Sequence, residues 1–353
     1  MQTFSLKLTV LSPVHIGTGE ELTPFEYIIR EKTLYRINLT ALIGSLEEGA
    51  RDELIGLVDR DSLAGVRKFI IENTDVGKHA LYSAGVSDKC AAQYESKLGD
   101  TGHQLIINPF IRNGGTYNAF LPGSSLKGAI RTGVLNHMAN SPGCRAHMRD
   151  PRDPRQIEQD IMDYKDGKED PFRALRISDA VSAEPAATGV MELLNVKVDR
   201  LGNFTENLAV MMNEFLLPGL ELECSLNIDT DLQNKSTHGA GVAYNIHINE
   251  IAEGCHNFYI NNLEQEHGDF YEKEEEDICD FSNKIMEVSN EMGDNDFLIR
   301  VGRYSHFENV TIEKYRPKQK DRLAPRKGYG KTRFTARGFG ITAPAGWVKC
   351  TLK

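Results

Sequence analysis

FSLKLTV, residues 4–10, alternates apolar and polar side chains along its whole length. A period of two is typical of a strand that buries one face in a core. ELECSLNID, residues 221–229, repeats this alternation far along the chain, and two further stretches also favour strands, FRALRISDAV (172–181) and VMELLNVKVDR (190–200). The return of the first pattern in the second half predicts two related modules.

Between these strands the sequence favours hairpins and helices. FEYIIREKTLYRI, residues 25–37, predicts a hairpin that turns near Glu31 and Lys32. Asn38 or Thr40 can cap a following helix. We further expect helices over residues 50–73, 123–138 and 155–164, and a hairpin within 103–121 that turns at 113–115. Two copies of strand, helix and strand predict an α+β fold with ferredoxin-like modules over residues 1–180 and 181–353, each with insertions.

The chain shows no sign of export or metal binding. It has no run of about 18 apolar residues and no signal-like amino terminus, so we expect a cytoplasmic protein without a membrane partner. The six cysteines lack metal-binding spacing, which indicates reduced thiols. We expect no metal and no other cofactor.

Charge is segregated along the chain. The net charge of -10 argues against a polyanionic partner, yet residues 312–337 carry ten Lys or Arg against Glu313 and Asp321. Aromatic residues interleave with these cations, which suits single-stranded RNA, although a solvated basic loop is the alternative. The candidate RNA contacts in this basic segment are Arg316, Lys318, Lys320, Arg322, Arg326, Lys327, Lys331 and Arg333.

LPGSSLKGAIR, residues 121–131, is a candidate phosphate-binding helix start. The backbone amides of Gly123, Ser124 and Ser125 lie where a helix leaves donors unpaired and its dipole favours an anion. Lys127 and Arg131, four residues apart, project from one face and extend the track. The Walker pattern is absent, because Gly128 follows Lys127. The alternative is a capped helix with two solvated cations.

RVGRYSHFENVTI, residues 300–312, supplies a second candidate. A Gly-containing loop after a strand offers amides, a cation and an aromatic platform to RNA. An ordinary turn is the alternative. The candidate residues of this loop are Gly302, Arg303, Tyr304, Ser305 and His306.

Three further features of the sequence could suggest function but also have structural interpretations. His15 follows the first strand and is a candidate RNA contact, or a general base in a nuclease, although no partner is evident from spacing. Asp179 after a strand is more typical of a cap than of a catalytic carboxylate. The acidic run from Glu264 to Asp280 indicates a solvated helix face or loop.

Five segments in order carry a family resemblance: SPVHIGTGEE (12–21), FLPGSSLKGAIRT (120–132), RISDA (176–180), FLIRVGRYSHFENVTI (297–312) and GFGITAPAGWVK (338–349). Together they resemble the RAMP family of CRISPR proteins, and within it the subunits that end the backbone of type III-A (Csm) effector complexes. The resemblance implies RRM-like modules, contact with guide RNA (crRNA) toward its 3′ region, and no nuclease centre. In it, residues 123–131 correspond to a guide-backbone cradle and residues 302–306 to a Gly-rich loop.

The resemblance also implies partners: guide RNA, target RNA, the other backbone and small Csm subunits, and cellular nucleases that trim the guide's 3′ end. APAGWVK departs from the expected Pro-Leu-Gly-Trp-like run, and residues 140–172 match no family motif. Two other functions remain open. One is a metal-independent endoribonuclease that uses His15 or another histidine, and the other is a protein-interaction cap with little RNA contact.

Overall fold

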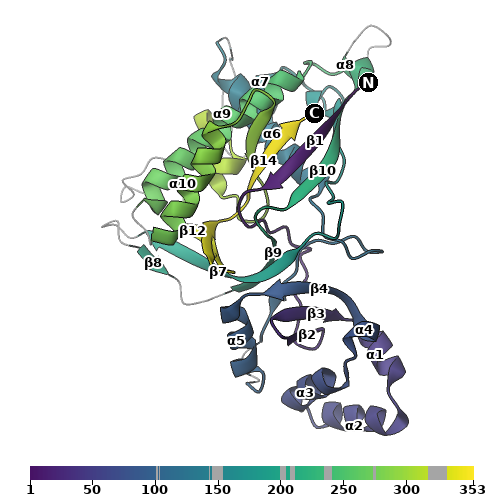
Figure 1. Cartoon of the computed structure of the whole chain (residues 1–353). Helices are drawn as coiled ribbons and strands as arrows, with labels where there is room; N and C mark the ends of the chain where they lie inside the picture. Colours follow the sequence, from purple (N-terminus) through teal and green to yellow (C-terminus); the bar gives the residue numbers. More distant parts are fainter. Residues whose placement is uncertain are drawn as a thin grey trace.

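The computed structural model describes residues 1–100, 102, 104–142, 144, 154–198, 204–206, 211–233, 241–272, 276–316 and 332–353. Two sheets organise this part of the chain (Figure 1). The five-stranded sheet has the order β11-β14-β1-β10-β6, and all its pairs are antiparallel. Its strands are β1 (Gln2–Val10), β6 (Leu175–Ile177), β10 (Glu221–Ile228), β11 (Asp296–Arg300) and β14 (Trp347–Leu352).

The second sheet follows the path β13-β12-β7-β4-β3-β2, with β5, β8 and β9 attached beside it. It is mixed, since β4 pairs in parallel with β7 and β5 in parallel with β9. Its strands are β2 (Tyr27–Arg30), β3 (Thr33–Ile37), β4 (Ala80–Val86), β5 (Ile107–Asn108), β7 (Thr188–Val198), β8 (Phe204–Glu206), β9 (Met211–Leu216), β12 (Thr332–Gly338) and β13 (Ile341–Pro344).

The helices form two groups, one on the five-stranded sheet and one in a lobe around β2–β4 (Figure 1). The first group contains α6 (Gly123–Asn140), α7 (Pro154–Met162), α9 (Ile248–Glu266) and α10 (Glu276–Asn290). The lobe contains α1 (Leu39–Ser45), α2 (Glu48–Asp59), α3 (Leu63–Asn73), α4 (Val76–His79) and α5 (Asp88–Lys97). Shorter elements are α8 (Thr230–Gln233), the 3-10 helices η1 (Pro171–Arg173), η4 (Phe307–Val310) and η5 (Glu313–Tyr315), and the π-helix η3 (His267–Tyr271).

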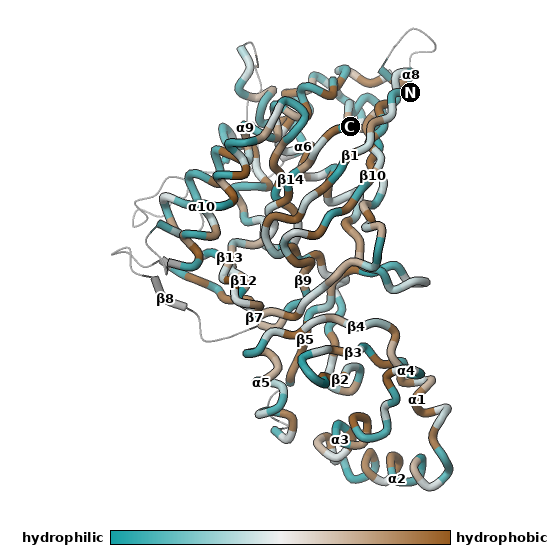
Figure 2. The backbone as a smooth tube through the Cα atoms, in the orientation of Figure 1, coloured by the Kyte–Doolittle hydropathy of each residue, from teal (hydrophilic) through white to brown (hydrophobic). Residues whose placement is uncertain are grey.

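The main core lies between the five-stranded sheet and helices α6 and α9. Figure 2 shows apolar residues along the strands of this sheet. Tyr259 of α9 and Trp347 of β14 are completely buried and meet edge to face, with ring centroids 6.4 Å apart. Gly133 lets the two helices approach closely, because a Cβ there would lie 2.8 Å from Cα of Cys255. Burial of this apolar surface is the main force that holds α6 and α9 in place.

Most predicted elements are confirmed. The strand at residues 4–10 is the central β1, and the predicted hairpin is β2–β3, whose turn residues Glu31 and Lys32 have φ of 49° and 56°. Asn38 caps α1, because its side chain accepts a hydrogen bond from the Ala41 amide at 3.1 Å. The α+β fold class predicted from the sequence is confirmed, with helices packed on sheets of mostly antiparallel strands.

Three predictions of local structure need correction. The helix expected over residues 50–73 is two helices, α2 and α3, because the chain turns at Asp61, whose φ is 56°. The strand expected over 172–181 shortens to the three residues of β6. Within 103–121, β5 pairs with β9 in place of a hairpin partner, and the turn after Asn113 is closed by an Arg112–Ala119 bridge and an Asn113–Asn118 backbone hydrogen bond.

The predicted boundary near residue 180 falls between β6 and β7. Both sheets take strands from either side of it, since β1 lies between β14 and β10, and β4 lies beside β7. The division of the chain into folding units at that residue stays a prediction. In the described part of the chain, no helix is long and apolar enough to cross a membrane.

Candidate nucleic-acid interface

A cleft of about 570 Å³ lies where three segments distant in sequence meet. Its walls are the loop after β1, one face of α6, and the end of β11 with the following loop and η4. This volume falls within the range of roughly 300–1,000 Å³ of ligand pockets. Two of the segments that the sequence singled out for RNA therefore share one cavity. Its lining includes Ile16, Gly17, Gly19, Ser125, Gly128, Thr132, Arg300, Gly302, Arg303, Ser305, Asn309 and Val310.

Gly302 and His15 fix the loop that forms one wall. Gly302 has φ of +97°, and a Cβ there would lie 2.4 Å from the backbone oxygen of His15. That oxygen accepts the Arg303 amide at 3.0 Å. The loop is thus held against the segment after β1, and the Arg303 side chain is exposed, with no hydrogen bond or ion pair to any residue that the structure describes.

His15 itself is part of the core. Its side chain is 1% exposed, its Nδ1 lies 2.7 Å from the Glu214 oxygen, and its ring stacks on Tyr304 at 5.6 Å. Burial lowers the pKa of His15, although the Glu214 hydrogen bond opposes this. Burial among aromatic rings suits a structural role for this imidazole, whose Nε2 has no hydrogen-bond partner among the described residues, and its contact with RNA stays a prediction.

Three other side chains of the predicted loop are also engaged. Tyr304 is 6% exposed, and its hydroxyl accepts a hydrogen bond from Asn213. Ser305 is 4% exposed and donates to the Gly302 oxygen at 2.8 Å. His306 accepts the Phe334 amide at 3.4 Å and stacks on the Phe334 ring. The prediction that Tyr304 offers an open stacking platform is therefore wrong, because its ring is used to pack the loop.

At the start of α6, the backbone amides that were predicted to bind phosphate already have partners within the protein. The Gly123 amide donates to the Asp179 carboxylate at 2.8 Å, and the Ser125 amide donates to the Pro122 oxygen at 2.9 Å. Asp179 is thus a cap, as expected from its position, and it occupies the anion position nearest the helix start. Ser124 is exposed, and Ser125 lines the cleft together with Thr132.

Lys127 and Arg131 lie on a different face of α6 from the cleft-lining residues. Lys127 donates to the Leu175 oxygen at 2.7 Å, and burial lowers its pKa. Arg131 pairs with Glu158 at 2.5 Å and Asp170 at 3.0 Å, and stacks over Phe172. Their charges thus tie α6 to β6, α7 and η1. Contact of these two cations with RNA stays a prediction, and the cleft does not include them.

The basic segment is described only at its ends. Lys318, Lys320, Arg322, Arg326, Lys327 and Lys331 lie outside the described residues. Arg316 donates to the Glu308 oxygen at 2.6 Å and to Asn262 at 3.1 Å. Arg333 is 2% exposed and forms ion pairs with Glu266 at 2.9 Å and Glu308 at 3.2 Å. The prediction that Arg333 contacts RNA is wrong, because its guanidinium is buried in the protein.

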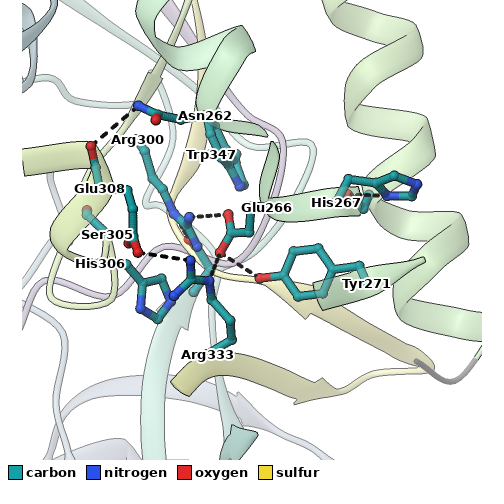
Figure 3. Close-up of polar contacts among 12 residues, drawn as sticks. Asn262, Glu266, His267, Tyr271, Arg300, Ser305, His306, Glu308, Arg333 and Trp347 are labelled. Atoms are coloured by element: carbon teal, nitrogen blue, oxygen red, sulfur yellow. Dashed lines mark hydrogen bonds and ion pairs between the residues drawn. The ribbon is translucent and has the colours of Figure 1, made fainter. Parts of the chain in front are cut away.

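A buried charge network lies behind the cleft (Figure 3). Glu266, 4% exposed, accepts ion pairs from Arg300 and Arg333 and a hydrogen bond from Tyr271. Burial alone would raise the pKa of Glu266, but the two guanidinium groups lower it to about 2. Glu266 belongs to the acidic run that was expected to be solvated, so this part of that prediction is wrong. The network joins α9, β11, η4 and β12.

Sequence reasoning missed the two residues at the floor of the cleft. Arg300 and Asn309 line it and are 1% and 2% exposed, and Arg300 Nη2 and Asn309 Oδ1 have no hydrogen-bond partner among the residues that the structure describes. Buried polar atoms are usually paired, so these two atoms are candidate positions for a bound water or a ligand. The one available signal was an Arg at the end of an apolar strand beside Gly302. No group of three or more His, Cys, Asp or Glu that could hold a metal occurs in the described ranges.

Comparison with known proteins identifies similar chains. The CRISPR system Cms protein Csm5 of Streptococcus thermophilus is 29% identical over 185 residues, which cover 51% of this chain and 52% of that protein. The protein of the same name from Methanocaldococcus jannaschii is 26% identical over 194 residues, covering 52% and 44%. The matched region thus spans about half the length of these curated relatives.

Two solved structures share the fold over nearly all of the chain. A chain of the Csm-crRNA-target RNA ternary complex of a type III-A CRISPR-Cas system has a TM-score of 0.69 at 22% identity, with 99% of this chain and 100% of that chain covered. The T. onnurineus Csm5 crystal structure has a TM-score of 0.65 at 20% identity, covering 97% and 99%. Residues 7–333 match the family model described as the RAMP superfamily, which is most of the chain. The protein belongs to the RAMP superfamily.

Proposed function

We propose that the protein is a guide-RNA-binding subunit of a type III-A CRISPR effector complex, which ends the complex's backbone and cuts no RNA itself. The observation that carries this proposal is the cleft, which unites α6, the loop after β1 and the Gly302 loop. The similarity to Csm5 proteins and to a chain of a Csm-crRNA-target RNA complex supports the choice of ligand. Target RNA, the other Csm subunits and guide-trimming nucleases are the partners that this function would bring.

The groups in the cleft match the chemistry of an RNA backbone. Arg303 at the rim is an exposed cation for a phosphate, and Ser125 adds a hydroxyl. A ribose 2′-hydroxyl both donates and accepts a hydrogen bond, so a hydroxyl in the cleft such as that of Ser125 can distinguish RNA from DNA. Binding through these groups does not depend on base sequence.

The absence of catalysis in this proposal rests on how the two histidines near the cleft are held. His15 is buried and bonded to Glu214, and burial lowers the pKa of His306 to about 3. A general base or acid in a nuclease needs a pKa near the working pH and reach to the substrate. Neither imidazole meets both conditions, so the endoribonuclease alternative has no observation in its favour.

The test is binding of guide-length single-stranded RNA to the purified chain at several salt concentrations. Arg303→Ala is expected to weaken binding about three- to tenfold and to flatten the slope of log affinity against log salt by about 0.7, the value for one lost phosphate contact on a single strand. Arg60→Ala, an exposed arginine on the distant lobe, is the matched control and should change neither quantity.

Three results separate this function from its alternatives. Equal binding by wild type and Arg303→Ala would remove the cleft from the proposal. Metal-independent cutting of repeat RNA that His15→Ala abolishes would favour the endoribonuclease. An assembled complex whose guide RNA never crosslinks to this chain would favour the protein-interaction cap.

A further inference from the structure

Exposed apolar side chains gather on the lobe around β2–β4. Ten large apolar residues are exposed in the described chain, and four of them fall between residues 43 and 63. These four form what we name the lobe face: Ile43, Ile55, Val58 and Leu63, exposed by 45%, 57%, 58% and 42%. Single exposed apolar residues are ordinary, but a cluster of this kind marks a surface that another molecule covers.

The four residues of the lobe face lie on neighbouring segments of the lobe. Ile55 and Val58 are three residues apart on α2, so they lie on one side of that helix together with Arg51. Arg51 donates to the Gly44 oxygen at 3.1 Å, which brings the end of α1, with Ile43, to this side. After α2 the chain turns tightly, because the Asp61 amide donates a hydrogen bond to the Val58 oxygen at 2.9 Å. Leu63 begins the next helix directly after this turn. Figure 1 shows α2 and α3 at the far end of the lobe, away from the five-stranded sheet.

The charges around the lobe face define what it can bind. Six acidic residues flank it, are exposed, and have no ion-pair partner among the described residues: Glu47, Glu48, Asp52, Glu53, Asp59 and Asp61. Arg51 and Arg60 are the two cations in the same stretch. This acidic excess repels RNA and anionic lipid alike. In a symmetric dimer formed through this face, the acidic residues of the two copies would lie opposite one another. Their mutual repulsion would oppose the contact.

We propose that the lobe face docks a protein subunit whose complementary surface is basic and carries small apolar side chains. Apolar contacts with Ile55 and Val58 would supply the affinity, and the acidic rows would select the basic partner and speed its approach. This inference rests on the proposed function, because the partner is taken from the same effector assembly. The lobe face lies on different elements from the RNA cleft, so one chain can hold RNA and this partner together.

The test is co-purification of the full chain, carrying the tag, with the guide RNA and the protein subunits encoded beside it. Two variants change the lobe face: Ile55→Ser with Val58→Ser, and Asp52→Lys with Asp59→Lys. Each is expected to lower retention of one basic subunit by about tenfold or more. Matched controls are Val181→Ser, at a residue 55% exposed elsewhere, and Glu287→Lys with Glu291→Lys on and just after α10.

The outcomes are distinct for the two proposals. Loss of one basic subunit in both variants, with the controls, the Tm and RNA binding by the purified chain unchanged, supports the docking surface. Full retention of every subunit overturns it and leaves the proposed function intact. A wild-type chain that retains neither RNA nor any subunit overturns both. A wild-type dimer that Ile55→Ser with Val58→Ser dissolves assigns the lobe face to a second copy and overturns the proposal.

Discussion

At the scale of single residues, Gly302 determines the shape of the cleft wall. Its φ of +97° is strained for any residue with a Cβ, and such a Cβ would also collide with the His15 oxygen. Gly302→Ala is expected to lower the free energy of unfolding by about 2–4 kcal/mol, because strain and collision add. It should also weaken RNA binding, since the loop that carries Arg303 must move. Urea unfolding and RNA titration measure the two effects.

A substitution at Gly340 measures the cost of backbone strain without a steric collision, for comparison with Gly302. It has φ of +76°, but no atom that the structure describes lies within 4 Å of the Cβ position, so Gly340→Ala should cost only about 1–2 kcal/mol. RNA binding by this variant should match wild type. If both variants lost the same stability, contact with His15 would not be what holds the Gly302 loop.

At the scale of elements, Arg131 is expected to stabilise the fold rather than hold RNA. It ties α6 to α7 and η1 through Glu158 and Asp170, and all three side chains are 21–30% exposed. Arg131→Ala should cost about 1–2 kcal/mol of unfolding free energy, discounted for this partial exposure. RNA affinity of the folded variant should stay within twofold of wild type. A specific loss of RNA binding with unchanged stability would restore the cradle predicted from the sequence.

The buried network joins four elements, and Glu266 is its only carboxylate shared by both arginines (Figure 3). Glu266→Gln keeps the shape and a hydrogen-bond acceptor for Tyr271 but leaves Arg300 and Arg333 without their common counter-charge. Removing one partner from a buried charged group costs about 3–5 kcal/mol. Glu264→Gln, two residues away and exposed, is the control and should cost less than about 0.5 kcal/mol. Equal stability of the two variants in denaturant titrations would contradict this account.

The sequence predicted the helices and strands better than it predicted which side chains contact one another. Alternation placed β1 correctly, and turn chemistry placed the β2–β3 hairpin, because both depend on local preferences. Of the positions linked with RNA, Ser125, Gly302 and Arg303 line one cleft, whereas Gly123 and Ser124 do not. Burial of Arg333 and Tyr304 was not predictable, because each is buried by segments far away in sequence. For the same reason, the roles of Arg300 and Asn309 required the fold.

At the scale of the whole molecule, the cleft and the lobe face differ in charge. The described part of the cleft bears an exposed Arg303, whereas the lobe face is rimmed by unpaired carboxylates. A net charge of -10 therefore says little about either surface. An anionic chain can bind RNA when its cations are local, and its remaining acidic surface discourages RNA from binding elsewhere.

The stability of the whole molecule should depend on pH through its buried histidines. Burial lowers the pKa of His15, His256 and His306, the last to about 3, from an ordinary value of 6.5. As the pH falls, the histidines are therefore protonated in the unfolded chain before they are protonated in the folded one. Their contribution to the unfolding free energy is complete only well above pH 6.5. It falls as the pH drops from about 6.5 toward 3, with a slope of up to about 1.4 kcal/mol per pH unit for each fully buried imidazole.

His306→Asn isolates one of these contributions. Between pH 6.5 and 5, the slope of unfolding free energy against pH should be smaller in this variant by about 0.7 kcal/mol per pH unit at pH 6.5, rising to about 1.3 at pH 5. At pH 8 the imidazoles are neutral in both folded and unfolded states, so the difference there gives the cost of losing the contacts with Phe334. Glu266, with its pKa lowered to about 2, contributes mainly below about pH 5, and it does so in both the variant and wild type. Parallel curves for the variant and wild type between pH 6.5 and 5 would show that His306 is protonated as readily in the folded chain as in the unfolded one.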